Sequence, residues 1–333
     1  MPTIRIVVED ASQTAEARRI ARKMARGIGF DDDKSERVAI AVTEACTNIL
    51  KHAVRGEILA STTESGHGLE VLALDRGPGM TNLDQCLRDG FSTGSSPGQG
   101  LGAILRLSTA SDFYSVLGQG TAVLARWLPA APNGFHERSG RLGIGAVNVS
   151  KPGQEVCGDS WGVEQTEHAT TLMVADGLGH GPEAQAASLE AVRMLRLNPD
   201  LAPKELIERC HMALRSSRGA AVAVARIDRA RGKVTYSGVG NISAAIYSGS
   251  KLMQHLVSVN GTAGHQTHRL QEFSYPWPAD GMLVLHSDGL ASSTSVESRA
   301  GLALHDPGLI AGVLYRDFAR GNDDSTVVVA KTA

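Results

Sequence analysis

The spacing of apolar residues changes along the chain. In the first 128 residues, apolar positions recur every three or four residues over two long stretches, which predicts amphipathic helices. Shorter alternating or continuously apolar runs predict strands, and the whole predicts a two-layer α/β sandwich with helices on one face of a mixed sheet. The predicted helices are Gln13–Ile28, Asp32–Ala53 and Ala103–Leu107, and the predicted strands are Thr3–Glu9, Glu70–Asp75 and two within Ser111–Trp127.

A break in both periodicities follows at Leu128-Pro-Ala-Ala-Pro-Asn-Gly134, which predicts a linker over residues 129–136. Beyond it, in residues 137–333, short apolar strands dominate, which predicts a β-sandwich flanked by helices. The chain is therefore assigned to the α+β class with two domains. The predicted helices here are Pro182–Leu197 and Ala202–Arg215, and the strands are Leu142–Ser150, Thr170–Ala175, Ala220–Ile227, Lys233–Ser237, Ala244–Tyr247, Met282–His286 and Ser325–Ala330.

Composition narrows the class of protein. The chain has 333 residues and a net charge of −2 without a basic block, which argues against nucleic acid as a partner. Its four cysteines lie far apart, which argues against a disulfide framework or a zinc ribbon. No signal-peptide pattern and no apolar run of roughly 20 residues is present, so we expect a cytoplasmic protein that is not inserted in a membrane.

A first group of candidate site residues lies in the N-terminal part. Val38, Val42, Ala45 and Ile49 form the apolar stripe of the Asp32–Ala53 helix. Glu44, Asn48 and His52 recur every four residues beside that stripe, so they are expected on one edge of the helix. An amide oxygen suits Mg²⁺, and a carboxylate can orient or deprotonate a nucleophile. The same ridge, taken alone, is also what a solvated helix edge looks like.

Asp75 is expected at the end of a buried strand, where Gly77 and Gly79 would let a ligand approach the backbone closely. A carboxylate at such a place can accept a hydrogen bond from the exocyclic amine of adenine. A glycine-rich segment with Gly98, Gly100 and Gly102 precedes a predicted helix, whose free N–H groups favour phosphate. Each feature alone is an ordinary turn or loop, and only their order and spacing make a nucleotide site specific.

A second group lies in the C-terminal part. Asp176-Gly177 and Asp288-Gly289 each follow a predicted core strand, and Asp323-Asp324 precedes a third. Acidic groups delivered at strand ends, with a glycine carbonyl beside them, predict an oxygen-rich site for two Mg²⁺ or Mn²⁺ ions and metal-assisted phosphoester hydrolysis. Asp-Gly pairs are also common turns. Zinc at His180 and His286 is a poorer alternative, because these residues show no metal-ligand spacing.

The first 128 residues resemble the GHKL ATPase superfamily, and within it the RsbT-type serine kinases of bacterial partner switching. The matching segments are Thr43-Glu-Ala-Cys-Thr-Asn-Ile-Leu-Lys-His-Ala53, Leu74-Asp-Arg-Gly-Pro-Gly-Met80 and the segment Ser108–Thr121. The resemblance implies a Bergerat-type ATP site. In it, Glu44 would be the base, Asn48 the Mg²⁺ ligand, Asp75 the adenine reader, Gly98–Gly102 the phosphate lid, and Thr121 a residue that fixes Asp75.

The residues from about 135 onward resemble the metal-dependent Ser/Thr phosphatases of the SpoIIE and RsbX branch. Five motifs occur in the family's order: Val-Cys-Gly-Asp-Ser-Trp161, Val-Ala-Asp-Gly-Leu-Gly-His-Gly181, Gly-Val-Gly-Asn-Ile242, His-Ser-Asp-Gly-Leu290 and Asp-Asp-Ser-Thr326. The resemblance implies that Asp176, Gly177, Asp288 and Asp323 bind metal and that Asp159 is a ligand or its neighbour. Gly158 stands where eukaryotic relatives have Glu, so one ion would be held weakly and Mn²⁺ needed at millimolar concentration.

These resemblances together imply a bifunctional regulator, a Ser/Thr kinase and a Ser/Thr phosphatase, that acts on a STAS-domain protein in a sigma-factor pathway or a diguanylate-cyclase pathway. A homodimer is compatible with the kinase resemblance. The alternative is a phosphatase whose N-terminal domain is a non-catalytic, ATP-gated binding module. An ATPase of the mismatch-repair or chaperone sort is a third reading, disfavoured because no transducer domain follows.

Overall fold

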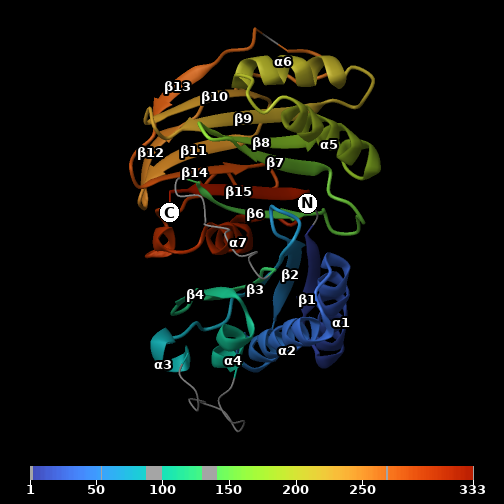
Figure 1. Cartoon of the computed structure of the whole chain (residues 1–333), viewed down its shortest axis with the longest axis vertical. Coiled ribbons are helices and arrows are strands. Elements are labelled where there is room, and N and C mark those ends of the chain that lie inside the picture. The colour runs from blue at the N-terminus through green and yellow to red at the C-terminus, as the bar shows by residue number, and fades with distance from the viewer. Residues whose placement is uncertain (1–2, 54, 88–99, 130–140, 268, 333) are drawn as a thin grey trace. The chain divides into compact units, whose positions relative to one another are not determined.

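The computed structural model of the chain describes residues 3–53, 55–87, 100–129, 141–267 and 269–332 (Figure 1). One compact unit is formed by Thr3–Glu137 and the other by Arg138–Ala333. The linker predicted over residues 129–136 lies, apart from Pro129, outside the described residues. None of the described helices combines the length and the apolar surface that a bilayer crossing requires. All four cysteines carry free thiols.

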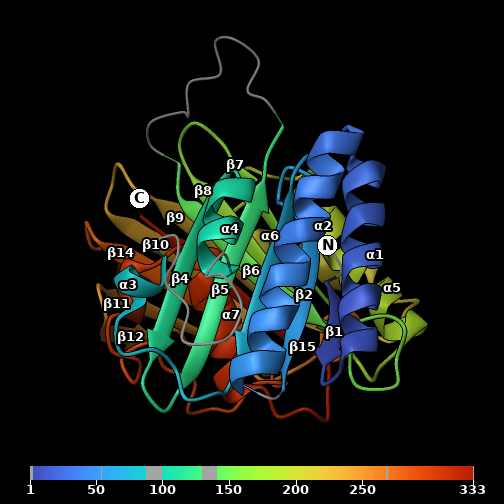
Figure 2. The same cartoon turned by 90° about the horizontal axis from the view of Figure 1, so that it is seen from below.

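The first unit is a five-stranded sheet with helices on one face, in the strand order β1–β2–β3–β5–β4 (Figure 2). Each pair of neighbouring strands is antiparallel, so the predicted mixed sheet is wrong. The reason is the helix pair between β1 and β2: two antiparallel helices return the chain to the end at which β1 finished. The elements are β1 (Ile4–Val8), α1 (Ala11–Ile28), α2 (Asp32–Asn48), η1 (Ile49–Ala53), β2 (Gly56–Thr62), β3 (Leu69–Asp75), α3 (Leu83–Leu87), α4 (Gly100–Leu107), β4 (Ala110–Val116) and β5 (Gly120–Trp127).

Local signals set the limits of α1. Asp10 caps the N-terminus by accepting a hydrogen bond from the Ser12 N–H, and Gln13 reaches back to the Asp10 N–H. Gly29 ends the helix with φ of 96°, a left-handed conformation that favours glycine. Small side chains let α1 pack closely, and the apolar stripe predicted on α2 is confirmed. The buried residues are Ala17, Ala21 and Ala25 of α1, and Val38, Val42 and Ala45 of α2 with Ile49 of η1.

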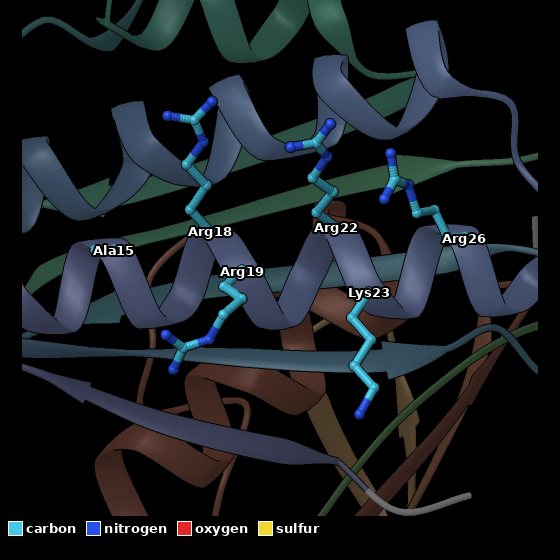
Figure 3. A pocket seen from close by; sticks show the side chains of 6 residues that line it. All are labelled: Ala15, Arg18, Arg19, Arg22, Lys23 and Arg26. Carbon is cyan, nitrogen blue, oxygen red and sulfur yellow. The ribbon is translucent and has the colours of Figure 1, made fainter.

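The outer face of α1 is strongly basic and borders a hollow on the surface (Figure 3). Arg18 and Arg22 point toward α2, where both form ion pairs with Glu36. Arg26 does the same with Asp32. These pairs are exposed, so each contributes at most about 1 kcal/mol to folding.

The loop after β3 is pressed against the β4–β5 hairpin. The Gly118 N–H donates to the Pro78 carbonyl at 2.7 Å, and the Met80 N–H donates to Ser115 Oγ at 2.9 Å. Gly120 has φ of 84°, and a Cβ there would overlap the carbonyl oxygen of Asp75. The hairpin therefore holds the end of β3 in place only because this position lacks a side chain.

The second unit contains two five-stranded sheets, ordered β13–β10–β9–β8–β7 and β12–β11–β14–β15–β6. The predicted β-sandwich with outer helices is confirmed: inward side chains such as Leu172, Leu285 and Val328 share one core between the sheets. The strands are β6 (Gly143–Val149), β7 (Asp159–Gln165), β8 (Thr170–Gly177), β9 (Ala220–Asp228), β10 (Lys233–Val239), β11 (Ser243–Ser248), β12 (Lys251–His255), β13 (Phe273–Pro276), β14 (Gly281–His286) and β15 (Ser325–Lys331).

Helices cover the outer faces of the sandwich (Figure 1). Met173 and Ala175 of β8 face outward and pack beneath α5 (Pro182–Leu197) and α6 (Pro203–Ala213). This second covered face explains why β8 is apolar at successive positions. On the other sheet, α7 (Pro307–Phe318) packs against β6 and β15, and a short turn, η2 (Leu302–Leu304), precedes it. The sequence reading missed α7, which is buried continuously from Gly308 to Arg316 and therefore lacks an amphipathic pattern.

An ion cluster is buried at the end of α7. The Asp317 carboxylate accepts hydrogen bonds from Arg316 at 2.7 Å and from Arg299 at 2.6 Å, and the Arg316 side chain is 2% exposed. Burial alone would raise the pKa of Asp317, but the hydrogen bonds and charges of Arg316 and Arg299 hold it below its usual value of 3.8. The cluster thus fixes the end of α7 with matched charges.

We predict that Gly120→Ala destabilises the first unit far more than Gly118→Ala. Both glycines have positive φ, 84° and 76°, so each alanine carries backbone strain of about 1–2 kcal/mol. A Cβ at Gly118 meets nothing within 4 Å, whereas one at Gly120 must displace Asp75. Urea unfolding should show an additional loss of roughly 2 kcal/mol for Gly120→Ala. Equal losses for the two variants would contradict this docking.

We predict that Asp317→Asn lowers the free energy of unfolding by about 3–5 kcal/mol at neutral pH, because the buried Arg316 and the partly buried Arg299 lose their shared counter-charge. Glu190→Gln, which breaks an exposed pair with Arg193, is the matched control and should cost less than about 1 kcal/mol. The folded-state pKa of Asp317 is lowered, so its contribution is complete above pH 3.8 and declines as the pH falls below that value. An unfolding difference that persists unchanged at pH 2 would contradict the assignment.

Candidate functional site

The first candidate site begins at the C-terminal end of α2. Glu44 and Asn48 are partly exposed there, and His52 is exposed. The predicted helix to Ala53 ends as an α-helix at Asn48 and continues as the π-helical turn η1. This wider turn ends the four-residue spacing that was expected to align His52 with the other two. Single π-helical turns are frequent at functional sites.

Asn48 faces the start of α4. Its Nδ2 is buried without a hydrogen-bond partner, and a Cβ on Gly100 would lie 2.8 Å from Asn48 Oδ1. Gly100 and Gly102 belong to the first turn of α4, which begins earlier than the predicted Ala103. The third glycine of the predicted phosphate lid, Gly98, lies outside the described residues. An unsatisfied carboxamide beside a helix N-terminus is a place where a polar ligand would be stabilised.

Asp75 is the last residue of β3. Its Oδ1 accepts hydrogen bonds from the Gly77 N–H at 2.8 Å and the Thr121 N–H at 3.2 Å. The hydroxyl of Thr121 is hydrogen-bonded to Ser115 at 3.0 Å. A Cβ on Gly77 would lie 2.8 Å from the Ala53 Cβ, so η1 contacts the loop after Asp75.

The structure thus brings together four segments that carry predicted nucleotide-binding residues. They are the C-terminal end of α2, the end of β3, the β4–β5 hairpin and the start of α4. The polar groups fit ATP with Mg²⁺: the Asn48 amide oxygen is a possible Mg²⁺ ligand, the unpaired Asn48 Nδ2 can donate to a ligand oxygen, and Asp75 is an acceptor held by two backbone N–H groups. The individual roles of Glu44, Asn48, Asp75, Gly77, Gly79, Gly100, Gly102 and Thr121 remain predictions.

The second candidate site lies where strands of both sheets end. Asp159 is the first residue of β7 and pairs directly with Asp176, near the end of β8. Asp288 follows β14 and Asp323 precedes β15, two neighbouring strands of the other sheet. Asn148 of β6 bridges the two sheets, since its Nδ2 donates to the Asp159 carbonyl at 3.1 Å and to Thr326 Oγ1 at 2.8 Å.

Glycines let these segments approach. A Cβ on Gly177 would overlap the carbonyl oxygen of Ala184, and one on Gly289 would overlap that of Asp324. The Gly177 N–H donates to the Gly158 carbonyl at 3.3 Å. Each Asp-Gly pair is therefore a tight contact between segments and not an exposed turn.

Burial, and after it the neighbouring acidic charges, raises the pKa of Asp159, Asp176 and Asp288. Burial, followed by the charges of Asp159 and Asp288, raises the pKa of Asp176 far above its usual value of 3.8. Burial also raises that of Asp159, although hydrogen bonds from Ser287 and Thr326 oppose this. For Asp288, burial and the charge of Asp323 raise the pKa, while Arg320 and a 2.7 Å hydrogen bond from Asn241 oppose it.

Such a set of repelling carboxylates fits a divalent cation, which would keep them ionised. The donors are oxygens, as Mg²⁺ and Mn²⁺ prefer, and one oxygen, Asp159 Oδ2, is buried without a hydrogen-bond partner. Among the described residues, however, no three His, Cys, Asp or Glu side chains already form an ion cage, so they would have to close around the ion. His180 is exposed and the His286 ring is hydrogen-bonded to the Ser287 carbonyl, so neither suggests zinc.

Sequence reasoning missed several polar residues of this site. Asn241 and Thr326 stood within the family-like motifs but received no role. Asp324 was passed over in favour of its neighbour Asp323, although it is 4% exposed and more buried. Nothing in the sequence marks Asn148, because its partners are distant along the chain.

Two family models match separate stretches of the chain. Residues 7–127 match the family model of the histidine kinase-like ATPase domain, and residues 166–333 match that of stage II sporulation protein E (SpoIIE). The serine/threonine-protein kinase RsbT of Bacillus subtilis is 35% identical over 115 residues, which cover 34% of this chain and 86% of RsbT.

The phosphoserine phosphatase RsbX of Bacillus subtilis is 25% identical over 142 residues, which cover 43% of this chain and 71% of RsbX. A crystal structure of RsbX in complex with magnesium shares the fold, with a TM-score of 0.51 and 22% identity over 59% of this chain and 98% of that one. The chain combines a kinase-like ATPase domain with a metal-dependent phosphatase domain, as in the partner-switching regulators. It therefore belongs to the SpoIIE family through its second half, and to the RsbT-like histidine kinase-like ATPase domains through its first part.

Proposed function

We propose that this chain sets the phosphorylation state of a STAS-domain protein by both adding and removing a phosphoryl group. The first unit would transfer phosphate from ATP–Mg²⁺ to a serine or threonine, and the second would hydrolyse that phosphoester with two Mn²⁺ or Mg²⁺ ions. The observation that carries the proposal is the grouping of Asp159, Asp176, Asp288 and Asp323 at strand ends of both sheets. The kinase and phosphatase named as relatives support the two halves.

In the phosphatase site, Asp176, Asp288 and Asp323 would hold the ions together with the Gly177 carbonyl and Asp159. Bound divalent cations would supply an activated water and offset the charge of the phosphate. The chain's own task is to keep the carboxylates fixed: Ser287 and Thr326 donate to Asp159, and Asn241 donates to Asp288. Once the carboxylates have closed around the ions, these hydrogen bonds would limit further reorganisation when the phosphate binds.

In the kinase site, Asn48 would hold Mg²⁺ and Glu44 would orient or deprotonate the acceptor hydroxyl. Asp75 would accept a hydrogen bond from adenine, and the start of α4 at Gly100 would receive phosphate oxygens. Phosphoryl transfer depends mainly on positioning and charge neutralisation. The rigid docking of the Asp75 loop on the β4–β5 hairpin is consistent with that requirement.

A STAS-domain partner would make the two opposing activities a switch. Joining both activities in one chain raises their effective concentration on the shared substrate. The output would be a sigma-factor pathway or a second-messenger pathway, and the protein would act in the cytoplasm, without nucleic acid or membrane, as a monomer or homodimer.

We predict that Asp176→Asn abolishes phosphatase activity. The variant loses the carboxylate that lies among the other acids, so hydrolysis of p-nitrophenyl phosphate or a phosphoserine peptide in millimolar Mn²⁺ should fall at least ~100-fold, or roughly 3 kcal/mol. Asp228→Asn is the control, since Asp228 lies at the opposite end of the same sheet. Residual activity in Asp176→Asn near that of the control would contradict the proposed hydrolysis site.

We predict that Asn48→Ala abolishes ATP-dependent phosphorylation, with a loss of ~100-fold or more. The assay uses radiolabelled ATP and recombinant STAS-domain proteins from the same genome. Thr47→Ala is the matched control, because the Thr47 hydroxyl donates to the Thr43 carbonyl within the helix. Unchanged transfer in Asn48→Ala would remove the metal assignment. Stable ATP-dependent complex formation without any transfer by the wild type would instead support the binding-module alternative.

A further inference from the structure

Two buried carboxylate oxygens next to the proposed phosphatase site, Asp159 Oδ2 and Asp324 Oδ2, have no hydrogen-bond partner. Asp324 is 4% exposed: its Oδ1 accepts from the Lys151 N–H at 2.8 Å, but its Oδ2 is unpaired. Asp159 is 3% exposed, and its Oδ2 is likewise unpaired. An unsatisfied buried carboxylate oxygen carries a substantial desolvation cost, so two together call for an explanation.

Asp324 Oδ2 lies against the backbone of Gly158, and the Asp324 carboxylate is close enough to Asp159 for its charge to act on it. A Cβ built on Gly158 would lie 2.7 Å from Asp324 Oδ2, so the carboxylate fills the space that a side chain at this position would occupy. Gly158 directly precedes Asp159, and its carbonyl accepts the Gly177 N–H. Asp324 Oδ2 is therefore adjacent to the backbone that carries Asp159 and to the strand end that carries Asp176.

Contacts with the segment 287–289 hold the backbone of Asp324 and the start of β15 in place. Its carbonyl oxygen is so close to Gly289 that no Cβ fits there, and the Thr326 N–H donates to Ser287 Oγ at 3.0 Å. The carboxylate cannot leave for solvent without disturbing the end of β15. The Cys157 thiol also lies beside this carboxylate, but a thiol is only a weak hydrogen-bond donor. A buried anion with so few donors is suited to a cation.

We propose that Asp324 is a further cation-binding carboxylate of this site: with Asp159, it contributes an oxygen to the binding of a divalent Mg²⁺ or Mn²⁺ ion at the Gly158 side. The inference rests on the proposed phosphatase function, since it assigns an additional residue to the same metal site. It accounts for both unpaired oxygens and for the absence of a side chain at Gly158.

The test is a titration of the full-length chain with Mn²⁺, without nucleotide, with the free ion followed by electron paramagnetic resonance. Asp324→Asn keeps an acceptor for the Lys151 N–H but removes the charge, and its affinity for one ion should fall ~10–100-fold. Asp280→Asn is the matched control, because Asp280 is exposed at the opposite end of the β11–β14 pair. Asp176→Asn provides the comparison for loss of a predicted ligand.

Thermal unfolding separates cation binding from a structural role. In chelator, Asp324→Asn should unfold at a higher temperature than the wild type, because an uncompensated buried charge is gone. Adding Mn²⁺ in place of the chelator should raise the unfolding temperature of Asp324→Asn by less than it raises that of the wild type. A structural role alone would lower the unfolding temperature equally in both conditions, and that result would overturn the inference.

Mn²⁺ binding by the variants distinguishes failure of the Asp324 assignment from failure of the phosphatase site as a whole. If the wild type and Asp324→Asn bind Mn²⁺ equally while Asp176→Asn does not, Asp324 has no part in ion binding and the phosphatase site stands. If the wild type binds no Mn²⁺ in the absence of nucleotide, the proposed phosphatase site falls, and this inference falls with it.

Discussion

Electrostatic repulsion among carboxylates at the strand ends is the constraint on which the second unit depends. The register of β7 on β8 places Asp159 directly opposite Asp176, and the neighbouring β14 and β15 supply Asp288 and Asp323. Closing the apolar core of the sandwich forces these acids together, whatever their mutual repulsion. The hydrophobic effect thus assembles a site of concentrated negative charge, and a divalent cation would make that charge favourable.

In both units, glycines allow the segment that carries a site carboxylate to pack directly against the backbone of another segment. In the second unit, Gly177 and Gly289 abut carbonyl oxygens of other segments, and in the first unit Gly120 abuts the carbonyl of Asp75. In each case a side chain would push apart the two segments that define the site. The two sites differ in charge density, however: the first offers an amide and a carboxylate held by N–H donors, and the second offers repelling carboxylates.

The sequence predicted what depends on neighbouring residues and missed what depends on distant ones. Asp176 and Asp288 could be placed because an apolar run and an Asp-Gly pair are local signals. The apolar stripe of α2 was predictable for the same reason. The strand directions in the first sheet were predicted wrongly. The sequence analysis did not recognise β2, and the helix pair before β2 returns the chain to the end of β1, so β2 runs antiparallel to β1. The helix α7 was not predicted because it is buried on all sides and lacks an amphipathic pattern. The role of Asn148 was not predicted because its hydrogen-bond partners lie on two different sheets.

The central claim is that the strand-end carboxylates of the second unit gather divalent cations. The most direct measurement is diffraction from crystals of the full-length chain grown with Mn²⁺, with data collected for the anomalous signal of manganese. The account predicts strong anomalous peaks bordered by the carboxylates of Asp159, Asp176, Asp288 and Asp323. Well-ordered density for these side chains with no manganese peak among them would contradict it.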